Sequence, residues 1–94
     1  MKIFRIRTTR SERNEYMQEI TLDENNTYYA NFADAKKHFS QARKHYKSED
    51  AVRYAEEQYL KGLFANSWKT EIDKEGDGGI VTLRTTMSEI DVVE

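Results

Sequence analysis

The segment 35–47, AKKHFSQARKHYK, gathers the residue types with which this chain could do chemistry. It holds five lysine or arginine side chains and two histidines. Histidines can bind a metal ion, and His38 and His45 would project to nearly the same side of a helix. Their spacing separates them by roughly 10 Å along the helix axis, whereas a shared zinc ion needs histidines about one turn apart or further ligands. We therefore expect no metal site and no cofactor.

The basic side chains of this segment are suited to an anionic partner. On a helix, Lys36, Arg43 and Lys47 share one outward stripe, and Lys37 and Lys44 share its neighbour. Such a surface can follow a phosphate backbone, because each neutralised phosphate releases counterions. A solvated helix face or a protein-binding surface has the same composition. Together with the first strand, the segment predicts a basic contact surface of Arg5, Arg7, Lys36, Lys37, Arg43, Lys44 and Lys47.

Acidic residues dominate the second half of the chain. Residues 1–47 carry a net charge of +4 and residues 48–94 one of −6, although the whole chain is only −2. This division favours a bipolar surface or an oriented encounter with a partner, unless the halves neutralise each other within the fold or across a dimer. Spaced carboxylates can imitate a phosphate backbone. We predict an acidic contact surface at Glu71, Asp73 and Asp77.

Residues for catalysis form no recognisable motif. The chain has no cysteine and no Gly-x-Ser-x-Gly sequence, which removes thiol nucleophiles, disulfides and thiolate metal sites. The glycine-rich stretch EGDGG (75–79) lacks the Lys-Ser/Thr of a phosphate loop and is typical of a hairpin turn. We predict that the protein is not an enzyme. Since the chain has neither the apolar run of a membrane span nor that of a signal peptide, we expect a cytoplasmic protein.

Strands are predicted at both ends of the chain from alternating polar and apolar residues. Residues 2–8 and 15–22 should form one hairpin, with a loop over 9–14 and a turn over 22–27. Residues 67–74 and 80–87 should form a second hairpin around the glycine turn. The tail 88–94 is either a short strand or a loose end. The first hairpin is expected to turn three large side chains inward: Tyr16, Ile20 and Leu22.

Two helices are predicted between the hairpins. The first follows Asn31, a good N-cap, and its apolar stripe is Phe32, Ala35, Phe39, Ala42 and Tyr46. The second follows Ser48 and ends at Gly62 or Asn66, and its stripe is Val52, Ala55, Tyr59 and Leu63. This ββ–αα–ββ order predicts a single α+β domain over 1–94, an antiparallel sheet of two hairpins with two helices packed on one face.

Three stretches together resemble a known kind of protein. They are the charged strand region MKIFRIRTTRSERNEYMQEITL, the alanine-bearing helix NFADAKKHFSQARK and the hairpin with its glycine turn. The combination resembles small bacteriophage-encoded proteins of ββ–α–ββ pattern, such as anti-CRISPR and other anti-defence inhibitors, with the second helix as an addition. The resemblance implies a protein that binds and blocks a macromolecule of the host, in the host cytoplasm, without catalysis.

We therefore predict a small, non-enzymatic binding protein of the phage-inhibitor type, with a protein as the favoured partner and no membrane association. Two alternatives stay open. One is a nucleic-acid-binding module that uses the basic helix 35–47. The other is a self-assembling structural subunit, in which the basic and acidic surfaces meet in a homodimer.

Overall fold

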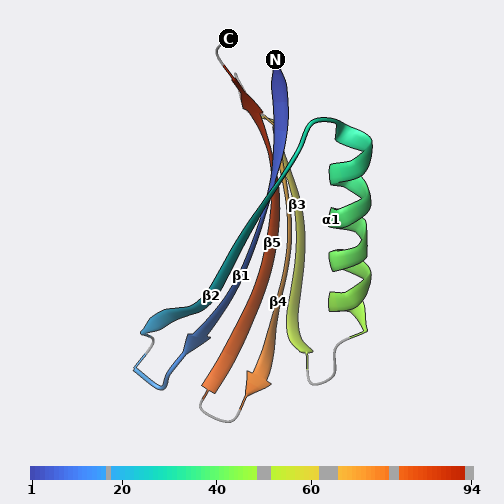
Figure 1. Cartoon of the computed structure of the whole chain (residues 1–94). Helices are drawn as coiled ribbons and strands as arrows, with labels where there is room; N and C mark the ends of the chain where they lie inside the picture. The colour runs from blue at the N-terminus through green and yellow to red at the C-terminus, as the bar shows by residue number, and fades with distance from the viewer. Residues whose placement is uncertain (17, 49–51, 62–65, 77–78, 93–94) are drawn as a thin grey trace.

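The described part of the chain forms one antiparallel sheet with a single helix on it. The structure, a computed structural model, describes residues 1–16, 18–48, 52–61, 66–76 and 79–92, and within 52–61 it describes only the side chain of Tyr59. The elements are β1 (Lys2–Arg13), β2 (Glu19–Tyr29), α1 (Phe32–Lys47), β3 (Val52–Lys61), β4 (Asn66–Gly76) and β5 (Gly79–Asp91). Their order across the sheet is β2-β1-β5-β4-β3 (Figure 1). The predicted α+β class is confirmed, with one helix instead of two.

Both predicted hairpins are present and longer than expected. β1 runs to Arg13 because it pairs with β5 from Lys2 onwards and with β2 on its other side. The predictions of a loop over 9–14 and a turn over 22–27 are therefore wrong, since residues 9–13 and 22–27 are strand. β4 and β5 pair up to Gly76 and Gly79. β5 continues to Asp91, so the first residues of the tail 88–94 extend this strand.

The predicted second helix is wrong, because its central residues form β3. They pair antiparallel with β4 from Val52 opposite Lys74 to Lys61 opposite Asn66. The sequence VRYAEEQYLK mixes strand formers with helix formers, so local preference does not decide between the two. A neighbouring strand that supplies backbone hydrogen bonds along its whole length decides for the strand. Residues 49–51 and the predicted helix end at Gly62 lie outside the described residues, whereas the alternative end, Asn66, is the first residue of β4.

The first helix is confirmed and is anchored on the sheet. The Asn31 side chain accepts a hydrogen bond from the Asp34 backbone N–H at 2.9 Å, as expected of an N-cap. Ala35 lies in the core with three sheet residues, Phe4, Ile6 and Met87. In contrast, Tyr16, Ile20 and Leu22, predicted to face inward, are exposed on and beside β2.

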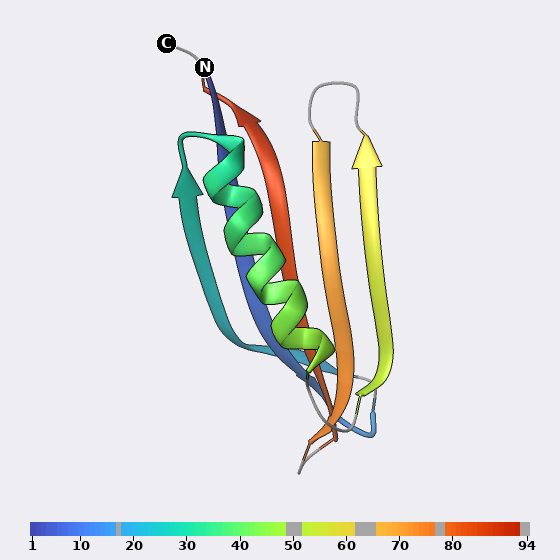
Figure 2. The same ribbon diagram turned by 90° about the vertical axis from the view of Figure 1, so that its right-hand side faces the viewer.

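The helix covers only part of the sheet. Figure 2 shows α1 lying across β1 and β5, while β4 and β3 extend beside it. Within the described residues α1 contacts β1, β2, β4 and β5 and makes no contact with β3. A helix is about 10 Å wide and strands lie about 4.8 Å apart, so one helix covers roughly two strands. The residues predicted to supply a second covering helix instead widen the sheet.

Candidate binding surfaces

The structure places the predicted basic residues on opposite faces of the sheet. Phe4 and Ile6 of β1 pack toward α1, so the alternating residues Arg5 and Arg7 lie on the other side, which we call the open face. The remaining members are exposed on α1: Lys36, Lys37, Arg43, Lys44 and Lys47. The two groups are therefore not brought together into one basic surface.

The predicted acidic residues share the open face with the arginines of β1. Glu71 lies opposite Arg84 of β5, and Asp73 lies opposite Thr82. The third predicted residue, Asp77, lies outside the described residues. Figure 1 shows the strands bowed, with their hollow side turned away from α1. Charges of both signs thus meet on this hollow side, in place of two separate poles.

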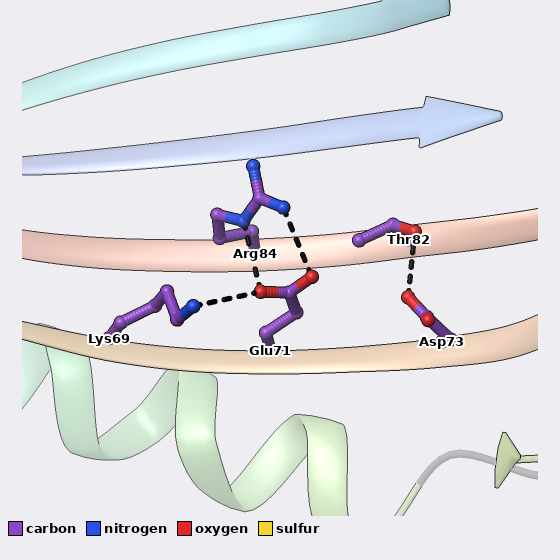
Figure 3. A network of polar contacts seen from close by, with 5 residues as sticks. All are labelled: Lys69, Glu71, Asp73, Thr82 and Arg84. Atoms are coloured by element: carbon purple, nitrogen blue, oxygen red, sulfur yellow. Dashed lines mark hydrogen bonds and ion pairs between the residues drawn. The ribbon is translucent and has the colours of Figure 1, made fainter. Parts of the chain in front are cut away.

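The carboxylate of Glu71 is held by two cations. It accepts hydrogen bonds from Arg84 Nε at 3.1 Å and Arg84 Nη2 at 3.0 Å, and Lys69 Nζ lies 3.3 Å away (Figure 3). Nearby, the Thr82 hydroxyl donates to Asp73 Oδ1 at 2.7 Å. Glu71 is only 8% exposed, so its carboxylate is largely shielded from water. The bidentate hydrogen bonds from Arg84 compensate for this loss of hydration.

The cations around Glu71 keep its carboxyl group ionised, which gives the residue a structural role. Burial raises the pKa of its carboxyl, but the hydrogen bonds and charges of Arg84 and Lys69 outweigh burial and hold that pKa below its usual value. The hydrogen bonds to Glu71 raise the pKa of Arg84 in turn, against the lowering effect of burial. A general acid at neutral pH needs the opposite shift. Glu71 therefore stays ionised and joins β4 to β5.

A row of aromatic rings on the helix-side face begins beside the start of α1 and continues past the helix to β3. The ring centroid of Phe32, at the start of α1, lies 5.6 Å from those of Phe4 and Trp68. The Trp68 centroid lies 5.1 Å from that of Tyr59 on β3. Phe32 is 40% exposed and Tyr59 is 53% exposed. Trp68 is half-buried on the inward face, as the sequence predicted, whereas Phe32, predicted to lie on the buried stripe of the helix, is exposed. Sequence reasoning missed this row because it put Tyr59 on a helix.

One basic side chain of α1, Lys36, lies on the flank of the helix next to these rings. Lys36 follows Phe32 by four residues and so lies on the same flank, which faces β4 because Phe32 contacts Trp68. We call the surface of Phe32, Lys36, Tyr59 and Trp68 the ledge. Lys37 lies on the opposite flank, where it lines a shallow hollow of about 330 Å³ beside Tyr29 of β2.

The histidines are separated as their spacing predicts. His38 Nδ1 is hydrogen-bonded to the Tyr29 hydroxyl at 2.8 Å, toward β2, while His45 lies in the last turn of α1. Within the described ranges, no three His, Asp or Glu residues are grouped so that they could hold a metal ion. No helix in the described part of the chain is long and apolar enough to cross a membrane. The chain matches no protein-family model, no curated protein and no solved structure.

Proposed function

We propose that this protein is a non-enzymatic binding protein that holds a segment of a protein partner on the ledge. The observation that carries the proposal is the incomplete cover of the sheet, which leaves Phe32 and Tyr59 exposed around Trp68. Water contact with such a cluster is costly, and burying it against a partner recovers roughly 25 cal/mol per Å² of apolar surface. Tryptophan and tyrosine are also the side chains that most often dominate binding energy.

The partner segment is expected to combine apolar and acidic side chains. Its apolar groups would lie on the rings of Trp68 and Tyr59, and its acidic groups would face Lys36. Charge pairs at the rim of an interface mainly orient the encounter and raise the association rate. The exposed ammonium of Lys36 is placed for that role, because it stands one helical turn from Phe32. The resemblance to phage-encoded inhibitors adds the expectation that the partner is a host protein in the host cytoplasm.

Single-stranded nucleic acid is the second candidate, favoured by basic and aromatic side chains lying together on the ledge. Bases stack on open ring faces that lie beside a positively charged track. The rings here are tilted against one another, by 48° between Phe32 and Trp68 and by 39° between Tyr59 and Trp68. Their faces are thus partly engaged with each other, which leaves a continuous apolar patch more suited to protein side chains than to separate bases.

A matched pair of tyrosine variants tests the proposal. Tyr59 is 53% exposed on the ledge, and Tyr28 is 59% exposed on the opposite edge strand. The wild type, Tyr59→Ala and Tyr28→Ala would each be used to isolate partners from cells, with quantification by mass spectrometry. We expect one protein to be retained by the wild type and by Tyr28→Ala and to be lost with Tyr59→Ala. Equal retention by all three would refute the ledge as the binding surface.

A separate fluorescence titration tests the nucleic-acid candidate. Trp68 is the only tryptophan in the chain, so its fluorescence reports directly on the ledge. We expect oligo-dT and oligo-rU, titrated at low and moderate salt, to leave this fluorescence unchanged. Saturable quenching with a steep salt dependence, lost in Tyr59→Ala, would reject the protein partner in favour of nucleic acid.

A further inference from the structure

The open face carries a pocket that is separate from the ledge. A pocket of about 120 Å³ lies where β2, β1 and β5 run side by side. Its lining residues are two arginines and four residues with hydroxyl groups: Arg7, Arg84, Thr9, Ser11, Thr21 and Thr86. Each of these side chains can donate a hydrogen bond, and none carries a negative charge.

The hydroxyl groups of this pocket are the second feature of the site. In the described part of the structure, the side chains of Thr9, Ser11, Thr21 and Thr86 make no hydrogen bond. Thr21 is exposed and Thr9 and Thr86 are half-buried, so a ligand arriving from solvent can reach their hydroxyl groups. Hydroxyl groups that the protein does not use itself can donate hydrogen bonds to a bound anion.

Both arginines keep donors for a ligand after their ion pairs are made. Arg7 Nε pairs with Glu24 at 2.6 Å, and Arg84 uses Nε and Nη2 on Glu71. Figure 3 shows the third guanidinium nitrogen of Arg84 pointing away from Glu71 and toward β1. The carboxylates that fix the two arginines are not among the lining residues. They therefore orient the cations without occupying the pocket.

We propose that this pocket binds a tetrahedral oxyanion, with phosphate as the ligand chemistry. Guanidinium groups match phosphate oxygens in geometry, and the hydroxyls of Thr9, Ser11 and Thr86 complete a ring of donors between the two arginines. The volume lies well below the roughly 300–1,000 Å³ of pockets for larger organic ligands. The anion is either free phosphate or a phosphate monoester group on a larger molecule that reaches the pocket from solvent.

Nuclear magnetic resonance titration of the whole chain tests this site. The probes are inorganic phosphate and phenyl phosphate, with acetate and chloride at matched ionic strength as controls. We expect saturable shifts at the side-chain resonances of Arg7 and Arg84 and at the β1 and β5 amides around them, with phosphate and not with acetate or chloride. Binding of phenyl phosphate at least as tight as that of inorganic phosphate would identify a monoester, and selective binding of inorganic phosphate would identify the free ion.

Matched variants separate a built site from general attraction to a basic protein. Arg7→Gln removes one cation from the pocket, and Lys37→Gln removes one from α1 on the other side of the sheet. We expect Arg7→Gln to weaken phosphate binding at least tenfold and Lys37→Gln to leave it unchanged. The double variant Thr9→Val/Thr86→Val keeps both arginines and side-chain volume, and it should also lose affinity. Shifts that centre on the lysines of α1, or equal affinity in all variants, would overturn the proposal.

Discussion

The hydrogen bond between Tyr46 and Thr85 should couple the helix to the sheet strongly enough to be measured. The Tyr46 hydroxyl lies 2.6 Å from Thr85 Oγ1, and the two residues are 5% and 0% exposed. Tyr46→Phe leaves the Thr85 hydroxyl buried with only Thr8 Oγ1 at 3.5 Å as a substitute. Leaving a buried polar group unpaired costs about 1–3 kcal/mol. Thr85→Val should also lower the free energy of unfolding, because it removes the same hydrogen bond from the other side.

The double variant distinguishes this hydrogen bond from a loss of packing. Tyr46→Phe/Thr85→Val replaces both partners by apolar groups of nearly the same shape, which can be almost neutral. We therefore expect its cost to be far below the sum of the single costs, with a coupling energy of about 1–2 kcal/mol. For a domain of this size each kcal/mol corresponds to a shift of about 4–8 °C in the unfolding midpoint.

Urea denaturation followed by circular dichroism and by Trp68 fluorescence would measure these free energies of unfolding. Tyr59→Phe is the matched control, because the Tyr59 hydroxyl donates to Asn66 at 3.2 Å in an exposed setting. We expect that control to cost less than about 0.5 kcal/mol, as surface substitutions generally do. If the costs of Tyr46→Phe and Thr85→Val simply add in the double variant, the hydrogen bond does not anchor α1 as described.

Three further substitutions test other parts of the fold by denaturation. Glu71→Gln should lower the free energy of unfolding by about 1.5–3 kcal/mol at pH 7, because charge-assisted hydrogen bonds to Arg84 are weakened. Since the folded-state pKa of Glu71 is lowered, its stabilisation is complete above the unfolded pKa and declines as pH falls through the folded value; the difference from Gln should therefore shrink in acid. Gly79→Ala should cost about 2 kcal/mol or more, because Gly79 has φ 147° and an added Cβ would collide with the Arg13 carbonyl oxygen. Asn31→Ala should cost about 1 kcal/mol through loss of the N-cap, and Asn31→Ser, which keeps a side-chain oxygen as the cap acceptor, should cost less.

Local periodicity predicted the strands and the helix that bury only one of their faces. The alternation of Phe4 and Ile6 and the three-four spacing from Phe32 to Tyr46 both describe one apolar face, and each face lies where expected. The glycine-rich turn likewise predicted the β4–β5 hairpin. Such patterns are readable because a single buried face imposes a period on the sequence.

The sequence could not predict the secondary structure of a segment when that structure depends on pairing with another strand of the chain. Residues 52–61 satisfy a helical spacing, yet they form β3 because β4 offers a partner along their length. Pairing between strands that are distant in the sequence also determines where the candidate sites lie. The position of β3 brings Tyr59 beside Trp68, and the pairing of β1 with β5 brings Arg7 and Arg84, which lie far apart in the chain, to one pocket. Composition alone predicted charged surfaces without showing that β1 and β4 would place opposite charges on one face.

Site-specific cross-linking on the two flanks of α1 tests the ledge most directly. A photoreactive amino acid at position 36 would face the ledge, and the same group at position 37 would face β2, although Lys36 and Lys37 are both exposed. We predict that position 36 forms a discrete cross-link to one partner protein, that Tyr59→Ala abolishes it, and that position 37 gives none. Cross-linking from position 37 alone, or from position 36 regardless of Tyr59, would contradict the assignment of the ledge as the binding surface.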